Sequence, residues 1–272
     1  MNNTKTSDSY PYVTGMGFRN RAHLIYDEFQ QDTSSNITKD GQVVFIKTDF
    51  VSEFFNSILP AIDYNVTIIT HNSDYNINTN YMQYIDNPKV ISWYAQNVDV
   101  EHAKLKSIPL GIANRRWPHG NIEDLEEVKA QTIDKQHLVY MNFNANTNSG
   151  KRNSVTSLFS KADYVYSAAN KSFMNYLIDL KSSKYVISPQ GNGIDCHRTW
   201  EALLMGSVPI VERSSNISFY ANLPILIIDN WASITEEFLE EKYKSFSFNT
   251  IEHMFIDFWI KEIGLLKEKR SI

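Results

Sequence analysis

The chain has 272 residues, of which 42% are hydrophobic and 13% aromatic, and its formal net charge is −5. This length and composition predict one large domain or two ordinary ones with a sizeable core. The acidic balance argues against a nucleic-acid-binding surface, no apolar run is long enough to span a membrane, and the single cysteine excludes an internal disulfide.

The first half of the chain alternates apolar runs with segments of helical pattern. Residues 43–47, 66–70 and 90–94 are short apolar runs typical of buried strands. Residues 51–59 are expected to form a helix between the first two strands, and residues 122–130 an acidic surface helix. This order predicts parallel strands connected by helices.

A second alternating series begins at residue 137. Its expected strands are 137–143, 164–167, 185–187, 208–211 and 225–228, and its expected helices are 154–161, 172–180 and 251–267. Two such series predict an α/β fold with two parallel sheets and helices on both faces of each. The boundary falls near residue 130, which gives an N-terminal domain of residues 1–130 and a C-terminal domain of residues 131–272.

The segment SPQGNGIDCHRTWEALLMGSVPIV, residues 188–211, joins two of these strands. Gly191 and Gly193 allow a tight turn and a close approach of the backbone to a ligand. Asp195 is expected to cap the following helix, whose first turn contains His197 and Arg198. Free N–H groups at a helix start, with cationic side chains beside them, favour a bound anion such as phosphate.

Two other interpretations of this segment stay open. The pair Gly191 and Gly193, with Glu212 about 20 residues further on, partly fits the dinucleotide-binding fingerprint. Cys196, however, stands where that fingerprint has its third glycine. Alternatively, the glycines serve only a tight turn.

The same segment resembles the signature of the exostosin-like glycosyltransferases. That signature is Ser-Pro-x-Gly-x-Gly-x-Asp-x-x-Arg, then a Trp/Phe-Glu-Ala-Leu helix, then Gly-x-x-Pro-Ile/Val. The segments IKTDF (46–50), THNSD (70–74), IPLGIANRRWPHG (108–120) and YMNFNANTNSGKR (140–152) are also similar to this group, particularly to its short soluble bacterial and large-virus members. The resemblance implies a GT-B fold: two Rossmann-like domains whose parallel sheets face a central cleft, with the last helix, about 251–267, packing back toward the first domain.

The resemblance also implies roles for the second domain, which would hold the donor. Glu201 would accept the ribose hydroxyls of a nucleotide sugar, while Arg198 and Arg152 would neutralise its diphosphate. The structural alternatives are a solvated helix glutamate, a surface ion pair and a surface cation. The full expected donor-binding set is Arg152, Ser188, Gly191, Gly193, Asp195, His197, Arg198 and Glu201.

The first domain would bind the acceptor and supply the general base. The candidates for the base are Asp74 first, then Asp49, and His71, because each follows a predicted strand. A capping or turn role is the alternative for each. The expected acceptor-binding residues are Arg115, Trp117 and His119. With a separate base, the reaction would invert the anomeric carbon. No Asp-x-Asp pair and no zinc-ligand spacing occur, so no metal is expected.

The sequence therefore predicts a glycosyltransferase that moves a sugar from a nucleotide-sugar donor to a hydroxyl of an oligosaccharide or glycoprotein glycan. The resemblance suggests a UDP-sugar, with UDP-xylose as a narrower expectation, and no cofactor. We expect no nucleic-acid or membrane partner. Because no secretory signal is evident, we expect a cytoplasmic protein, in the host cytosol for a viral member. The alternatives are a non-catalytic module that binds nucleotide sugar or glycan, and an NAD-dependent oxidoreductase.

Overall fold

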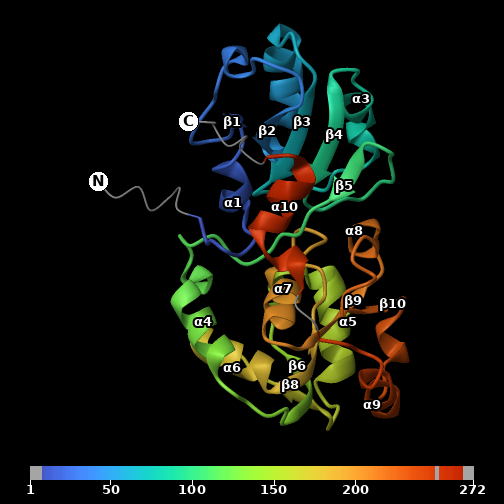
Figure 1. Cartoon of the computed structure of the whole chain (residues 1–272). Coiled ribbons are helices and arrows are strands. Elements are labelled where there is room, and N and C mark those ends of the chain that lie inside the picture. The colour runs from blue at the N-terminus through green and yellow to red at the C-terminus, as the bar shows by residue number, and fades with distance from the viewer. Residues whose placement is uncertain (1–7, 249–250, 266–272) are drawn as a thin grey trace. The chain divides into compact units, whose positions relative to one another are not determined.

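The computed structural model describes residues 8–248 and 251–265 of the chain (Figure 1). The chain divides into two compact units, residues 1–110 with 252–272 and residues 111–251. Within the described residues, each unit contains one five-stranded sheet, and all pairs of neighbouring strands in it are parallel. The expected α/β fold with two Rossmann-like units and parallel sheets is confirmed.

The strands of the first sheet lie side by side in chain order. They are β1 (Leu24–Tyr26), β2 (Gln42–Lys47), β3 (Val66–His71), β4 (Val90–Ala95) and β5 (Leu105–Ser107). Helical residues follow β2 as α2 (Val51–Glu53), a π-helical turn (Phe54–Ile58) and a 3-10 turn (Leu59–Ala61). The side chains of Phe54, Phe55 and Leu59, with that of Ile85 in α3 (Met82–Ile85), belong to the same apolar core cluster as β2, β3 and β4.

The two ends of the described chain meet in this first unit. Tyr12 stacks on Phe255 with ring centroids 5.7 Å apart, and the Ile256 N–H donates to the Pro11 carbonyl. Pro11 lies shortly before α1 (Gly15–Arg19), and Ile256 is the first residue of α10 (Ile256–Ile263). The Tyr94 hydroxyl on β4 donates to the Glu262 carbonyl of α10 at 3.2 Å. The helix expected at 251–267 is shorter: it begins at Ile256 after the 3-10 turn Glu252–Met254, and Gly264 ends it with φ +78°. Residues 266 and 267 lie outside the described residues.

The second sheet has a different strand order. Its strands are β6 (His137–Met141), β7 (Val165–Ser167), β8 (Ser183–Ile187), β9 (Val208–Glu212) and β10 (Leu226–Ile228), arranged as β10-β9-β8-β6-β7. The chain moves from β6 to β7 in one direction, then crosses back to place β8 on the other side of β6. The direction of winding therefore reverses between β6 and β8, which is the kind of position where open α/β sheets bind ligands.

Helices cover both faces of the second sheet (Figure 1). Buried side chains of α5 (Ser149–Phe159) and α9 (Glu236–Tyr243) join the core cluster on one face. The helix α6 (Phe173–Lys181) packs with α4 (Ile122–Ala130) and with α7 (His197–Leu204), and α8 (Ser215–Ser218) follows β9. Short 3-10 turns occur at Ser34–Asn36, Thr48–Phe50, Thr79–Tyr81, Pro118–Gly120, Ala145–Asn148, Trp231–Ser233 and Glu252–Met254.

The helix α4 lies in the second unit, whereas a boundary near residue 130 would place it in the first. Leu125 and Val128 of α4 are fully buried, and the Lys181 ammonium of α6 donates to the Lys129 carbonyl at 2.6 Å. The acidic pattern of this helix predicted its existence but gave no signal of the surface that it covers.

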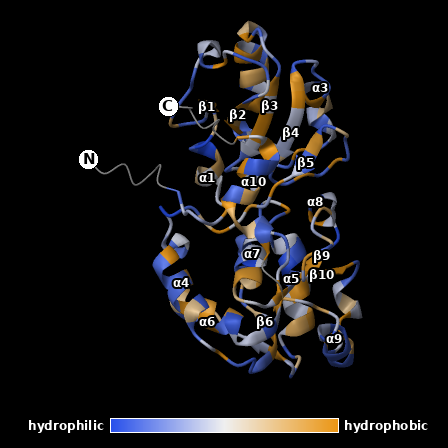
Figure 2. Cartoon of the chain, in the orientation of Figure 1, coloured by the Kyte–Doolittle hydropathy of each residue, from blue (hydrophilic) through white to orange (hydrophobic). Residues whose placement is uncertain are grey.

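Apolar residues are concentrated along the strands of both sheets (Figure 2). Trp93 on β4 is completely buried, and its indole N–H donates to the Thr70 hydroxyl on β3 at 2.9 Å. This bond satisfies two polar atoms that burial would otherwise leave without partners. No helix among the described residues is both long and apolar enough to cross a membrane.

Candidate functional site

Two loops meet at the carboxyl ends of β6 and β8, where the winding of the second sheet reverses. Residues 142–148 follow β6, and residues 188–196 follow β8. The loops are joined by the Asn148 side-chain amide, which donates to the Gly191 carbonyl at 2.8 Å. Ligands of open α/β sheets bind in the crevice outside such strand ends.

Arg152 projects from the first turn of α5 into these loops. The Asn148 side chain caps this helix, so α5 begins five residues before the expected start at residue 154. Although Arg152 is 5% exposed, its Nε donates to the Gln190 carbonyl at 2.9 Å and its Nη1 to the Asn144 carbonyl at 2.8 Å. The structure therefore rules out the surface-cation alternative for this residue.

Gly191 leaves room for the Arg152 guanidinium. A Cβ atom at Gly191 would lie 3.0 Å from Arg152 Nη2 and 3.7 Å from Cys196 Sγ. The backbone at Gly191 does not adopt a positive φ, so the requirement here is space rather than conformational freedom. The sequence predicted that the backbone approaches a ligand here; in the structure the group that lies against Gly191 is the Arg152 side chain.

Arg198 lies in the first turn of α7 beside the same loops. Its Nε donates to the Asn142 carbonyl at 2.9 Å, and its Nη1 is buried with no hydrogen-bond partner among the described residues. The guanidinium carbons of Arg198 and Arg152 each lie 5.5 Å from the centroid of the Phe143 ring. Burial, and secondly the charge of Arg198, lower the pKa of Arg152.

Neither guanidinium forms an ion pair with a carboxylate in the part of the chain that the structure describes. Within the described residues, the partners of these two cations are backbone carbonyl groups and, for Arg152, the Cys196 thiol at 4.0 Å, so no negative charge compensates theirs directly. An unpartnered buried N–H costs free energy until a ligand accepts from it. The arrangement is suited to a bound anion with several oxygen atoms.

The start of α7 differs in one respect from the prediction. The N-cap residue is Cys196, not Asp195, and no side chain caps the helix. The Asp195 carboxylate instead accepts from the Trp200 indole N–H at 2.8 Å and from the Cys196 N–H at 2.8 Å. The Trp200 indole N–H is a buried donor, and its bond to the Asp195 carboxylate holds that carboxylate where it does not cap α7. Gly206 follows the helix with φ +69°, which confirms the expected stop.

Glu201 lies one turn after His197 on α7 and is 3% exposed. The Tyr176 hydroxyl on α6 donates to Glu201 Oε2 at 2.7 Å. Burial raises the pKa of Glu201 to about 7, while the Tyr176 hydrogen bond and the Arg198 charge oppose this rise. A buried, hydrogen-bonded carboxyl group is not the solvated helix glutamate of the structural alternative.

The other expected donor-binding residues have partners inside the same unit. The Ser188 and Thr199 hydroxyl groups lie 3.0 Å apart in a buried pair. His197 Nδ1 lies 2.7 Å from the Gly111 carbonyl oxygen. Gly193 is buried in the loop that follows β8. The contacts of Ser188 and His197 help to fix the shape of the loops.

The expected acceptor-binding residues lie in the second unit too, around the turn Pro118–Gly120. Trp117 is 50% exposed and stacks on His119, with ring centroids 6.3 Å apart. His119 in turn lies 6.2 Å from the His197 ring at the start of α7. Arg115 forms an exposed ion pair with Glu123.

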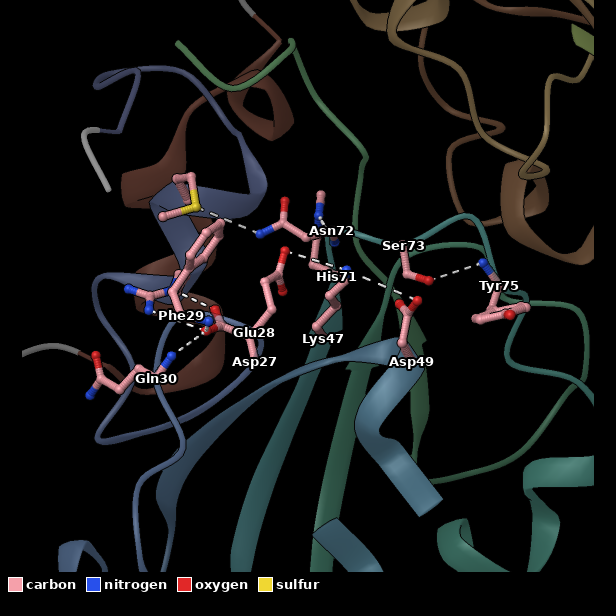
Figure 3. Close-up of polar contacts among 12 residues, drawn as sticks. Asp27, Glu28, Phe29, Gln30, Lys47, Asp49, His71, Asn72, Ser73 and Tyr75 are labelled. Carbon is pink, nitrogen blue, oxygen red and sulfur yellow. Dashed lines mark hydrogen bonds and ion pairs between the residues drawn. The ribbon is translucent and has the colours of Figure 1, made fainter. Parts of the chain in front are cut away.

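The three candidate bases lie at the carboxyl ends of β2 and β3 in the first unit. His71 is buried, and the Asn72 N–H donates to its Nδ1 at 2.7 Å (Figure 3). Its Nε2 lies 3.2 Å from the Pro109 carbonyl oxygen. Nδ1 must therefore be the acceptor and Nε2 the protonated nitrogen. This tautomer leaves no free lone pair, which argues against His71 as a base.

The two aspartates have more open surroundings. The Asp49 side chain is 37% exposed, and one of its oxygens lies 4.0 Å from the Lys47 ammonium, which also pairs with Glu28 at 3.4 Å (Figure 3). Asp74 is exposed in the turn that follows β3. Both carboxylates are thus accessible to a ligand. No group of three or more His, Cys, Asp or Glu side chains suited to a metal occurs within residues 8–248 and 251–265.

Comparison with known proteins finds a family similar to one part of the chain. No curated protein sequence gives a significant match to it. The model of the RXYLT1 C-terminal domain family matches residues 138–254, a span that includes Arg152, Arg198 and Glu201. This part of the chain is therefore similar to a xylosyltransferase-like family of glycosyltransferases.

Proposed function

We propose that the protein transfers a sugar from a nucleotide-sugar donor to a hydroxyl group of a glycan acceptor. The observation that supports this most directly is the pair of Arg152 and Arg198, two neighbouring guanidinium groups with no carboxylate partner among the described residues and one buried Nη1 without any partner. The pair lies at the strand ends where α/β sheets bind nucleotides. Both residues lie in the span that matches the transferase family.

The diphosphate of the donor is the anion that this pair would bind. Two arginines and the uncapped start of α7 would hold its oxygen atoms, and they would stabilise the charge that develops as the nucleoside diphosphate leaves. Glu201, three residues after Arg198 on the same helix, would accept the ribose hydroxyls. We propose a UDP-sugar as donor, because uridine is the usual base of the exostosin-like enzymes that the sequence resembles. The family match favours xylose as the sugar.

We propose inversion at the anomeric carbon with a carboxylate base. The acceptor hydroxyl oxygen bonds to the anomeric carbon while the bond from that carbon to the diphosphate oxygen breaks. The hydroxyl proton passes to the carboxylate, and the electron pair leaves with the nucleoside diphosphate. Asp74 is the first choice for this base and Asp49 the second. His71 is not retained, because both of its ring nitrogens are hydrogen-bonded.

Trp117, His119 and Arg115 are proposed to contact the acceptor glycan. An exposed indole stacked on an imidazole offers an apolar face of the kind on which sugar rings can pack. We propose that neither a metal nor a cofactor takes part, since the arginine pair supplies the charge that a cation would otherwise supply. A chelator should then leave turnover unchanged.

A turnover assay tests the proposal. The protein is incubated with UDP-xylose and other UDP-sugars together with a panel of oligosaccharides, and release of UDP is measured. The anomeric configuration of the product is determined by proton NMR. Turnover with one donor and an inverted product supports the proposal; retention of configuration would refute the assigned base.

The assay also separates the alternatives. Binding of nucleotide sugar without turnover for any acceptor would favour a non-catalytic binding module. Binding of NAD in preference to every nucleoside diphosphate would favour an oxidoreductase, for which Gly191, Gly193 and Glu212 are the sequence signal. The family match favours the transferase over both.

A further inference from the structure

The carboxyl group of Glu201 has one defined partner on a neighbouring helix. The Tyr176 hydroxyl of α6 donates to Glu201 Oε2 at 2.7 Å, a short distance typical of a bond to a charged acceptor. Although Arg198 precedes Glu201 by one turn, no ion pair within 4.0 Å joins them in the described structure, and Arg198 Nε is directed to the Asn142 carbonyl instead. The tyrosine therefore fixes the carboxylate more closely than the arginine does.

Tyr176 is itself held in place by rings on two elements. Its ring centroid lies 6.1 Å from that of Phe173 on α6 and 6.2 Å from that of Tyr140 on β6. The Tyr140 hydroxyl is engaged elsewhere: it donates to Asp179 at 3.2 Å and accepts from the Asn142 amide at 2.7 Å. The hydroxyl that reaches Glu201 thus comes from a side chain with restricted freedom.

We propose that Tyr176 is a positioning residue: it binds one oxygen of the Glu201 carboxyl group and so directs the other oxygen to the ribose hydroxyls of the donor. This inference depends on the proposed function, because it assumes that Glu201 accepts from a ribose. Tyr176 itself would not contact the nucleotide. Its effect would pass entirely through Glu201.

The charge of Glu201 should depend on the same bond. Burial raises the pKa of Glu201 to about 7, and the Tyr176 hydrogen bond is the larger of the two effects that oppose this rise, the other being the charge of Arg198. Burial raises the pKa of Tyr176 well above its usual range, so its hydroxyl remains a donor at neutral pH. Removing that hydroxyl should raise the pKa of Glu201 further, and the protonated form is a poorer acceptor.

The test compares two nucleotides that differ only at the ribose. Affinities for UDP and for 2′,3′-dideoxy-UDP are measured by calorimetry between pH 6 and 9, in wild type and in Tyr176→Phe. The ratio of the two affinities cancels the titration of the diphosphate. Hydrogen bonds to a charged group contribute about 1.5–3 kcal/mol, so wild type should prefer UDP by about ten- to a hundredfold above pH 7.

In wild type this preference should decline as the pH falls through about 7, because Glu201 gains a proton. In Tyr176→Phe the preference should be several-fold smaller at pH 7, and its midpoint should lie at a higher pH. In Glu201→Gln the preference should be small and independent of pH. Adding Tyr176→Phe to Glu201→Gln should cause no further loss, since the tyrosine acts through the carboxyl group.

Tyr164→Phe serves as the matched control. The Tyr164 hydroxyl donates to the Ile234 carbonyl at 3.2 Å in the same unit and makes no contact with Glu201, so its removal should leave the preference and its midpoint unchanged. An unchanged midpoint in Tyr176→Phe would overturn the inference, as would a loss of equal size in the Glu201→Gln background. If wild type binds UDP and dideoxy-UDP equally, the assigned ribose role of Glu201 fails, and that failure is visible without any variant.

Discussion

The two sheets of this protein have the same number of described strands and the same parallel pairing, but they differ in strand order. The first runs β1-β2-β3-β4-β5 in chain order, whereas the second runs β10-β9-β8-β6-β7. Only the second has a point where the winding reverses. At that point two loops meet around Arg152 and Arg198, as a ligand site in an open α/β sheet requires.

The corresponding edge of the first sheet is filled by its own chain. His71 and Asn72 lie at the end of β3, and a Cβ atom at Gly15 of α1 would be 2.5 Å from His71 Nδ1. A short helix is thus packed directly on these side chains, and Asp49 and Asp74 remain exposed beside them. The comparison shows two cationic side chains at the strand ends of the second sheet and exposed carboxylates at those of the first.

The largest expected effect tests the first unit. Asp74→Asn should lower kcat by about 10²–10⁴-fold, the usual contribution of a general base, while the affinity for UDP stays unchanged. Steady-state kinetics and calorimetry on the same preparation check both quantities. Asp49→Asn is the comparison variant; a larger loss of kcat there than in Asp74→Asn would transfer the role of base to Asp49.

The next effect concerns the stability of the second unit and its pH dependence. The folded-state pKa of Glu201 is raised to about 7 from 4.5, so the folded chain binds a proton more tightly than the unfolded chain between these values. The free energy of unfolding should therefore fall as the pH rises from about 4.5 to about 7, and level off above. With about 1.4 kcal/mol per pKa unit, this single group accounts for up to about 3 kcal/mol.

Glu201→Gln should remove that dependence, so the difference in melting temperature between variant and wild type should change with pH in this window. Thermal unfolding at pH 5, 6, 7 and 8 measures it. Glu241→Gln, an exposed residue on α9, provides the control. A difference that is the same at all four pH values would show that Glu201 is ionised throughout.

The smallest expected effect tests the space that Gly191 leaves for Arg152. In Gly191→Ala the new methyl group would lie 3.0 Å from Arg152 Nη2, so the guanidinium must move and the affinity for UDP should fall about three- to tenfold, on the order of 1 kcal/mol. Gly150→Ala is the matched control in α5, because the nearest atom to its Cβ would be 4.0 Å away. That variant should bind UDP normally and be slightly more stable, by about 0.4–1 kcal/mol. Equal affinities in the two variants would contradict the role assigned to Gly191.

The sequence predicted most strands of both sheets, including the short β7 and β10, but it missed some short elements near the N-terminus. Apolar runs such as 66–70 and 208–211 gave β3 and β9 nearly in full, because buried parallel strands are continuously apolar. The strand β1 (Leu24–Tyr26) and the helix α1 (Gly15–Arg19) were missed, since each is short and no clear apolar run or helical period marks it. Strand order was also beyond reach, because it depends on contacts between distant segments.

For the candidate site, the sequence predicted which residue types gather after β6 and β8 but not how they pair. Arg152, Arg198 and Glu201 were all expected, and the structure brings the two arginines to one aromatic ring, Phe143. Tyr176 was not expected, because nothing in the local pattern of α6 distinguishes it from a core tyrosine. Asp195 was assigned as a cap because its preference for that position is strong, yet the indole of Trp200 competes for the same carboxylate.

The most direct test of the account is whether Arg198 recognises a diphosphate. Calorimetry should compare UDP with uridine in wild type, in Arg198→Ala and in Arg213→Ala, whose exposed arginine pairs with Asp229 in the same unit. We predict that wild type and Arg213→Ala bind UDP at least about a hundredfold more tightly than uridine, as two or more charged hydrogen bonds would require, and that Arg198→Ala loses most of this difference. An undiminished preference for UDP in Arg198→Ala would contradict the proposed donor site.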